Sequence, residues 1–341
     1  MQSRRGFIPS PHALYAHTPT PQTPPSPNQS RGVGSRGYPC SAPTRPRPVR
    51  SVLVSLWVWF AIGAIIVLWV PVMAVARLVD RDPAHYYAGY TLRIMGRLLT
   101  YVNPFWQIEL EGPFPENPRN PYVVVGNHFS QADPPILAHV PWEMKWVAKK
   151  ALFDLPFAGW LLHLSGDISV DRSSKKSRAQ VLTTAADYLS KHCSVMFFPE
   201  GTRSRDGRVH RFSDGAFRLA IKEGVPVLPL VIDGTHEALP KHSIWFAPNP
   251  EPIRVKVLPP VPTDDLTPDD ARALQRRVRA QIIAQIAKWR GVPPKDVDGL
   301  ADTDAAATDW LGDDAADIDN APDGEASIKP PPSADASEPG G

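Results

Sequence analysis

The chain has 341 residues, a formal net charge of +2, forty prolines and two cysteines. The small net charge is a sum of unlike segments: residues 1–50 carry a net +7, residues 51–290 a net +6 and residues 291–341 a net −11. The two cysteines, Cys40 and Cys193, argue against a disulfide framework and a cysteine-rich zinc site. We expect both terminal segments to be disordered, because neither has enough apolar residues to offset the loss of chain entropy.

Residues 52–76 form an uncharged stretch in which Ser55 is the only clearly polar side chain. A helix of that length can cross the hydrocarbon core of a bilayer, which is about 30 Å thick. We therefore predict a membrane segment. The alternatives are a buried helix of a soluble protein and a signal peptide, and the second is disfavoured by the fifty preceding residues and by Arg77. Arginines before the segment predict that this side faces the cytoplasm.

A second helical pattern follows at residues 84–103. Its apolar residues lie on one face, with Arg93 and Arg97 on the other, and its tyrosines suit the membrane interface. Pro83 separates the two helical segments, since proline breaks a helix. A hairpin of one deep helix and one interfacial helix would return the chain to the cytoplasmic side. The alternative is a single span followed by an amphipathic helix of the soluble domain.

After residue 104, short apolar runs alternate with helical patterns. We predict strands at 122–125, 167–170, 194–198, 227–232 and 253–258, and helices at 135–140, 157–164, 176–191, 214–223 and 268–289. The last helix has Thr267 as its cap and Pro268 at its first position. This alternation predicts an α/β fold: a single mixed sheet flanked by helices, preceded by an N-terminal membrane helix or helical hairpin.

These patterns divide the chain into four expected parts. Residues 1–50 are a disordered arm rich in proline and arginine, and residues 51–103 are a membrane-associated helical motif. Residues 104–290 are the folded domain, and residues 291–341 are a disordered acidic tail.

Polar clusters follow three of the predicted strands. They are Asn127-His128, Asp171-Arg172 and Pro199–Ser204. In open α/β sheets, ligands bind beyond the carboxyl ends of the strands. We therefore expect the three clusters to meet in one functional site.

His128 and Asp133 are the candidate proton-transfer pair. Histidine is the side chain best suited to take a proton near neutral pH, and a carboxylate on its other ring nitrogen orients it. Residues five apart diverge on a regular helix, so the pair can meet only if His128 lies on the loop and Asp133 in the first helical turn. Alone, such a pair is more often an ordinary loop histidine beside a helix cap. No serine or cysteine stands out as a nucleophile, which suggests that the substrate supplies it.

Basic residues near the predicted strand ends are candidates for binding a phosphate. Arg172 and Arg203 can form forked hydrogen bonds to phosphate oxygens, Lys149 and Lys150 add point charges, and Gly201 allows close backbone approach. The alternative for each arginine is an ordinary surface ion pair. The histidines show no metal-ligand spacing, so we expect no metal and no cofactor.

Four sequence blocks together resemble the glycerolipid acyltransferase family, of the 1-acylglycerol-3-phosphate acyltransferase type. The blocks are the His-x4-Asp segment from Asn127 to Asp133, Gly166–Arg172, Phe198–Ser204 and Val225–Leu230. Two flanking stretches, Lys149–Phe153 and Gly234–Lys241, are also similar to the family. The resemblance covers residues 52–290, and the blocks stand in the family's order.

The resemblance implies a membrane-bound enzyme that moves a fatty acyl group to the free hydroxyl of 1-acylglycerol-3-phosphate. His128 would be the general base and Asp133 would orient it. The acceptor would be bound by Lys149, Arg172, Glu200, Gly201, Thr202 and Arg203. The donor would be acyl-CoA or acyl-carrier protein, which places the catalytic domain on the cytoplasmic face. Nucleic acid is not an expected partner.

Two other functions remain open at this stage. One is the same chemistry on another lysolipid or on glycerol-3-phosphate. The other is a non-catalytic, lipid-binding scaffold whose charged ends recruit partners, although intact His128 and Asp133 count against it. The oligomeric state is left open by the sequence.

Overall fold

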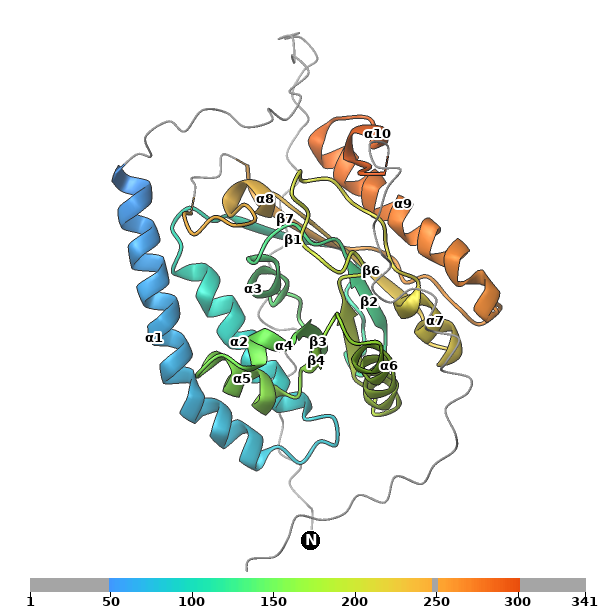
Figure 1. The fold of residues 1–341 in the computed structure, drawn as a ribbon, viewed down its shortest axis with the longest axis horizontal. Helices are drawn as coiled ribbons and strands as arrows, with labels where there is room; N and C mark the ends of the chain where they lie inside the picture. Colours follow the sequence, from blue (N-terminus) through green and yellow to red (C-terminus); the bar gives the residue numbers. More distant parts are fainter. Residues whose placement is uncertain (1–48, 247–250, 301–341) are drawn as a thin grey trace, which may run out of the picture.

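A computed structural model describes residues 49–246 and 251–300 of the chain (Figure 1). A seven-stranded sheet lies at its centre, with helices on both faces. Its strands are β1 (Ile108–Glu111), β2 (Val123–Gly126), β3 (Met144–Lys149), β4 (Ile168–Val170), β5 (Ser194–Phe197), β6 (Val227–Asp233) and β7 (Ile253–Val257). The helices are α1 (Val49–Val79), α2 (Tyr86–Tyr101), α3 (Asp133–Leu137), α4 (Lys150–Phe153), α5 (Ala158–Ser165), α6 (Lys175–Ser190), α7 (Gly215–Lys222), α8 (Thr235–Ala238), α9 (Ala271–Arg290) and α10 (Pro294–Val297), with a 3₁₀ turn at Pro268–Asp270 (η2).

The strands run in the order β1-β7-β6-β2-β5-β3-β4. Neighbours from β6 to β4 are parallel, whereas β7 is antiparallel to β6 and carries β1 parallel to itself. The predicted single mixed sheet is therefore confirmed. Because β6, β2, β5, β3 and β4 point the same way, their carboxyl ends share one edge of the sheet.

Apolar side chains alternate between the two faces of the central strands, so each face has its own core. On one face, Val123 and Val125 of β2 pack with side chains of α6, α7 and α9. On the other, Val124 of β2 packs with α3 and with residues of α1. All residues of β2, β5 and β6 are buried, which explains why these strands read as continuous apolar runs.

All five predicted strands are present within two residues of their expected bounds, and β1 and β3 were not predicted. In β3 the apolar pattern is interrupted by Lys145, which is fully buried. Its ammonium group donates to the backbone oxygens of His85 (2.9 Å) and Ser165 (2.7 Å) and to Glu143 (3.1 Å). Contacts from two distant segments and from neighbouring Glu143 therefore stabilise a charge whose sequence pattern is that of a surface residue.

Two helices, α1 and α2, are present in the predicted region and are separated by a turn that contains Pro83, whereas the interfacial position of α2 stays a prediction. Helix α1 has 31 residues, or about 46 Å at 1.5 Å per residue, and is long and apolar enough to cross a membrane. It also forms hydrogen bonds to other segments near its start and in its second half. Ser51 donates to the carbonyl of Phe246 and Trp69 to that of Thr91. The helix therefore lies along the side of the domain and exposes its outer apolar face.

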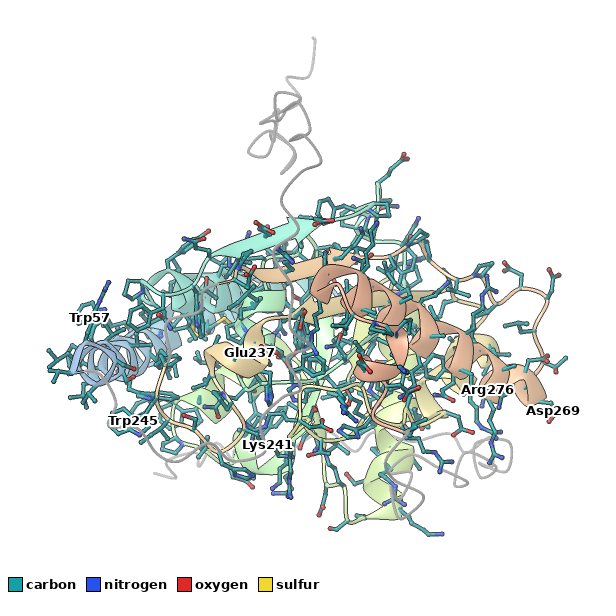
Figure 2. All side chains as sticks on the ribbon, turned by 90° about the horizontal axis from the view of Figure 1, so that it is seen from above. Trp57, Glu237, Lys241, Trp245, Asp269 and Arg276 are labelled. Atoms are coloured by element: carbon teal, nitrogen blue, oxygen red, sulfur yellow. The ribbon has the colours of Figure 1, made fainter. Side chains whose placement is uncertain are left out.

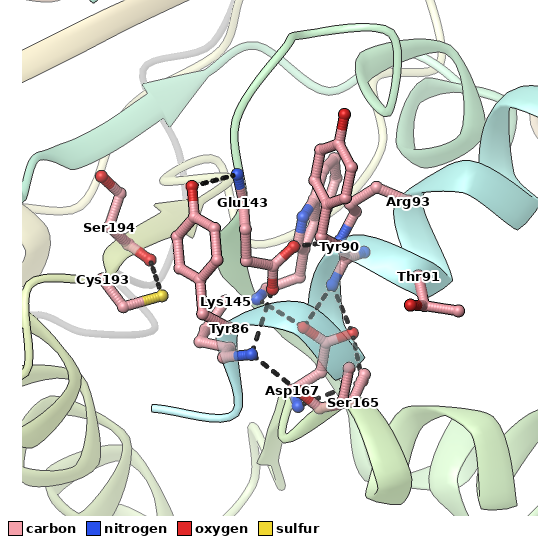
Figure 3. Close-up of polar contacts among 12 residues, drawn as sticks. Tyr86, Tyr90, Thr91, Arg93, Glu143, Lys145, Ser165, Asp167, Cys193 and Ser194 are labelled. Carbon is pink, nitrogen blue, oxygen red and sulfur yellow. Dashed lines mark hydrogen bonds and ion pairs between the residues drawn. The ribbon is translucent and has the colours of Figure 1, made fainter. Parts of the chain in front are cut away.

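Arg93 of α2 was expected on the polar face of that helix, and this expectation is wrong. Its guanidinium is buried and donates to both oxygens of Asp167 (2.6 and 2.7 Å) and to Glu143 (3.3 Å) (Figure 3). Asp167 also accepts from the backbone N–H of Trp146 at 2.9 Å. Arg93, Lys145, Glu143 and Asp167 form a buried cluster with two charges of each sign, and it joins α2 to the sheet. Helical spacing could not reveal this, because the partners lie far away in the chain.

The fold continues past the expected boundary at residue 290. Helix α10 and the residues after it pack against the loop that follows β5, where Val209 and Asp298 form a bridge between backbones. Asp298 also accepts from Arg279 of α9 at 2.6 Å. Residues 291–300 therefore belong to the folded part, whereas the rest of the predicted acidic tail and residues 1–48 of the arm lie outside the described residues.

We predict that Arg93→Ala strongly destabilises the protein. The substitution removes a positive charge from beside the buried carboxylates of Asp167 and Glu143. Breaking a buried ion pair typically costs about 3–5 kcal/mol. The free energy of unfolding, measured by urea titration of the full chain in detergent, should fall by that order.

Arg97→Ala is the matched control, because Arg97 lies one turn further along α2 and is half-exposed beside Tyr90. It should change stability by about 0.5 kcal/mol or less. Equal effects of the two substitutions would contradict the role assigned to the buried cluster.

Candidate active site

The three predicted clusters lie at the shared edge of the sheet. Asn127 and His128 follow β2, Asp171 and Arg172 follow β4, and the Pro199–Ser204 segment follows β5. Since β5 lies between β2 and β3, and β4 is next to β3, these strand ends are neighbours. The strand order places the three clusters along one edge of the sheet, and their union in one functional site stays a prediction.

His128 and Asp133 form a hydrogen-bonded pair. His128 donates from Nδ1 to Oδ2 of Asp133 at 2.7 Å. His128 lies on the loop after β2, and Asp133 is the first residue of α3, which is the arrangement that the pair requires. The Asp133 carboxylate is fully buried, and its Oδ2 also accepts from the backbone N–H groups of Phe129 (2.7 Å) and Ser130 (2.9 Å). These bonds fix the carboxylate, and the carboxylate in turn fixes the imidazole.

The histidine ring is held on a second side by Phe198. The two rings stack with their centroids 4.1 Å apart and their planes 18° apart. The His128 side chain is 13% exposed, and its Nδ1 is engaged with Asp133. Because Nδ1 keeps the proton that it donates to Asp133, Nε2 is the nitrogen that can accept a proton from a bound substrate.

The Glu200 side chain binds the backbone of His128. Its Oε1 accepts from the backbone N–H of His128 (2.8 Å), and its Oε2 accepts from the backbone N–H of His210 (3.0 Å). In return, the His128 carbonyl accepts from the backbone N–H of Ser204 at 2.8 Å. Burial raises the pKa of Glu200 to about 7, although these two N–H groups oppose the rise. Both carboxylate oxygens thus bind the backbone of this chain.

The turn after Glu200 contains Gly201, Thr202 and Arg203. Gly201 has a φ of 67°, a conformation that favours glycine, and its N–H donates to the carbonyl of Phe198 at 3.0 Å. Thr202 is exposed, and its hydroxyl accepts from Lys241 at 3.1 Å. Lys241 donates also to the carbonyl of Arg203 at 2.6 Å. Lys241 was not among the predicted site residues, and the only sequence signal was its place in the Gly234–Lys241 stretch.

Positive charges gather beside this turn. The pKa of Lys241 is lowered by its burial and by the charges of Arg205 and Arg203. The pKa of Arg172 is lowered by burial and then by the charge of Arg203. Like charges held together favour the binding of an anion, because an anion relieves their repulsion.

Lys149 occupies a more peripheral position. It is the last residue of β3, pairs in register with Val170 of β4 and is exposed. The pKa of Asp171, next to Arg172, is lowered mainly by hydrogen bonds from Ser173 and further by the charges of Lys150 and Lys149. Lys149 therefore lies on the β4 side of the same sheet edge as the other predicted cations.

Helix α9 supports the site through two arginines that lie three turns apart on one face. Arg290 donates to Asp233 at the end of β6 and to the carbonyl of Gly207 at 2.9 Å, and its guanidinium carbon lies 5.6 Å from the centroid of the Phe129 ring. Arg279 binds the carbonyls of Val209 and His210. The sequence offered no sign of this role, because both arginines read as polar positions of an amphipathic helix.

Comparisons with known proteins show similarity to acyltransferases. The family model described as Acyltransferase matches residues 107–233. The chain is 34% identical over 196 residues to human 1-acyl-sn-glycerol-3-phosphate acyltransferase alpha, covering 56% of this chain and 69% of that one. It is 34% identical over 175 residues to the chloroplastic 1-acyl-sn-glycerol-3-phosphate acyltransferase BAT2 of Brassica napus, and the match spans half of each chain.

A solved structure shares the fold. The crystal structure of the 1-acyl-sn-glycerophosphate acyltransferase PlsC from Thermotoga maritima superposes with a TM-score of 0.57 at 24% sequence identity. The similarity covers 69% of this chain and 96% of that one.

We predict that Arg290→Ala lowers the free energy of unfolding by about 3 kcal/mol. The substitution leaves the Asp233 carboxylate, which is only 12% exposed, without its guanidinium partner. Arg276→Ala, at an exposed position of the same helix, is the control and should change stability by about 0.5 kcal/mol or less. Thermal unfolding of both variants in detergent tests this difference, and equal melting temperatures would contradict it.

The titration of Glu200 predicts a specific dependence of stability on pH. In the unfolded chain this carboxyl ionises near its ordinary pKa of 4.5, whereas in the folded protein it keeps its proton up to about pH 7. The folded state binds more protons between these values, so the contribution of Glu200 to stability is complete below pH 4.5 and is lost as the pH rises through 7. The loss should be on the order of 3 kcal/mol.

Glu200→Gln removes this titration and is the comparison variant. The stability of the unsubstituted protein relative to this variant should decrease as the pH rises from 5 to 8 in urea titrations. A difference that is constant over this range would contradict the raised pKa of Glu200.

Proposed function

The chain belongs to the glycerolipid acyltransferase family, and on that premise we propose that it transfers a fatty acyl group from a thioester to 1-acylglycerol-3-phosphate, giving phosphatidate. The donor is acyl-CoA or acyl-carrier protein, and the catalytic domain lies on the cytoplasmic face of the membrane. The observation that carries the proposal is the His128–Asp133 pair, with one free ring nitrogen, at a sheet edge that also carries phosphate-binding candidates.

The proposed reaction uses His128 as general base. Nε2 takes the proton of the acceptor's free hydroxyl while the hydroxyl oxygen attacks the thioester carbonyl carbon. The resulting imidazolium is stabilised by the Asp133 carboxylate on the other ring nitrogen. The tetrahedral intermediate collapses with loss of the thiolate, which takes up the proton from His128. Atoms and charges balance, and the products are the new ester and the free thiol.

The acceptor phosphate binds to the positive charges beside the Gly201–Arg203 turn. Arg203 and Arg172 provide forked donors, and Lys149 adds a charge from the end of β3. Thr202 lies at the exposed surface of the turn. Glu200 and Gly201 act on the acceptor indirectly in this proposal, because the Glu200 oxygens are engaged with the backbone and Gly201 shapes the turn.

The membrane location fits the acceptor. Helix α1 is a candidate membrane span, and a lysolipid carrying a long acyl chain resides in a bilayer. Acyl donors of both classes are cytosolic, so a catalytic domain on the cytoplasmic face meets both substrates.

We predict that His128→Ala lowers turnover by about 10²–10⁴-fold, the range expected for loss of general-base catalysis. Thioester consumption by the full chain in detergent, with 1-acylglycerol-3-phosphate as acceptor, is the measurement. Asp133→Asn should also lower turnover, because it removes the charge that stabilises the imidazolium.

A panel of acceptors completes the test. It contains 1-acylglycerol-3-phosphate, glycerol-3-phosphate and a lysolipid whose phosphate carries a headgroup, and the first should give the highest kcat/KM. His163→Ala, at a histidine outside this loop, is the control and should keep its activity. Undiminished turnover by His128→Ala would overturn the mechanism, and preference for another acceptor would overturn the substrate assignment.

A further inference from the structure

A short apolar surface lies between β3 and β4. Leu152, Leu155, Phe157 and Trp160 are exposed on the segment that joins α4 to α5, with Leu155 at 47% and Trp160 at 51% of full exposure. Among the described residues outside α1 and α2, the other exposed large apolar side chains are scattered singly. We call residues 152–160 the α4–α5 segment.

This segment is continuous with the candidate membrane helix. Leu161, the residue after Trp160, is buried in a cluster with Met73 of α1 and Leu92 of α2. In Figure 1, α4 and α5 lie beside the lower half of α1, next to α2 and away from α9. Any bilayer that covers the outer face of α1 therefore reaches close to the α4–α5 segment.

The charges at the start of the segment suit the surface of an anionic membrane. Lys149 and Lys150 are both exposed, and Lys150 pairs with Asp154 at 3.1 Å. A tryptophan next to lysines is typical of the headgroup boundary, where the ring is buried and the ammonium groups stay in water. The exposed Lys150–Asp154 ion pair limits how deeply the segment can enter the bilayer, so shallow insertion fits better than a segment that crosses the membrane.

The backbone presents the aromatic side chains on a rigid turn. Phe157 has a φ of 59°, in the region that favours glycine, yet it carries a large ring that contacts Trp160 with centroids 5.0 Å apart. A side chain in such a conformation costs about 1–3 kcal/mol and persists where surrounding contacts hold it. Phe157 therefore keeps an exposed apolar ring in a conformation that is unfavourable for its backbone.

We propose that the α4–α5 segment is a second membrane-inserting element, which enters the headgroup boundary of an anionic bilayer beside α1 through Leu155, Phe157 and Trp160. Lys149 stands at the base of this element and is a candidate ligand for the acceptor phosphate. The element therefore brings the membrane surface next to the phosphate-binding side of the site, so that a lysolipid reaches it from the bilayer. This last step rests on the proposed function, whereas the insertion itself does not.

The insertion is tested with a single fluorescent label on the full chain. Leu155→Cys is combined with Cys40→Ser and labelled with a polarity-sensitive dye, since the remaining Cys193 is fully buried and does not react. The protein is placed in phosphatidylcholine vesicles containing phosphatidic acid, with and without brominated acyl chains. The dye should shift to the blue and be quenched by the brominated lipid.

The control carries the same label at Arg276→Cys. This position is exposed on α9, at the opposite end of the molecule from Trp57 of α1 (Figure 2). Its dye should be neither shifted nor quenched. A label at Leu155→Cys that brominated lipid does not quench would overturn the proposal. A blue shift without quenching, seen only as the protein self-associates, would also overturn it, because a second copy of the chain would then cover the segment.

A second measurement separates insertion from chemistry. In Leu155→Ser/Trp160→Ser the KM for long-chain acceptor embedded in vesicles should rise about ten-fold, because apolar burial in the bilayer is lost. With a short-chain acceptor dispersed in water, kcat and KM should be unchanged. Equal kinetics on both acceptors in variant and parent would overturn the delivery step. Absence of transfer to any acceptor by the parent chain would instead overturn the proposed function and leave the quenching result intact.

Discussion

The buried carboxylate of Glu200 connects the two loops on which the candidate active site depends. Its two oxygens accept the backbone N–H groups of His128 and His210, which lie on the loops after β2 and β5. A buried carboxyl is costly unless hydrogen bonds compensate for its burial, and burial accordingly raises its pKa to about 7. The position of His128 is therefore set by a group whose own position depends on both loops and on the sheet edge beneath them.

The site divides into a rigid part and an exposed part. Asp133 and Glu200 are buried and bind the backbone or the histidine, so they define where the imidazole of His128 lies. The cations are more exposed, and burial and mutual repulsion lower the pKa values of Arg172 and Lys241. The rigid part thus fixes the geometry of the histidine, and the exposed part concentrates positive charge near the surface.

The membrane side of the molecule is joined to the catalytic side by charge as well as by apolar packing. Arg93 of α2 reaches into the sheet to bind Asp167, which stands next to Ile168 at the start of β4. Helix α1 packs along α2 and α5, so the helical hairpin and the α4–α5 segment form one side of the molecule. The candidate membrane helix is thus a structural part of the domain and not a tether joined to it by a flexible linker.

Local patterns of the sequence determined the α/β class, five of the seven strands, the two N-terminal helices and the four blocks that carry the family resemblance. They worked because short apolar runs and proline breaks act over a few residues. They did not reveal β3, the buried Arg93 or the support from Lys241 and Arg290, since each depends on partners far away in the chain. A charged residue has the same local signature whether it faces water or a distant carboxylate. Only the tertiary structure brings these partners together, because their contacts join segments that are far apart in the chain, and it alone decided which charges are paired inside the fold.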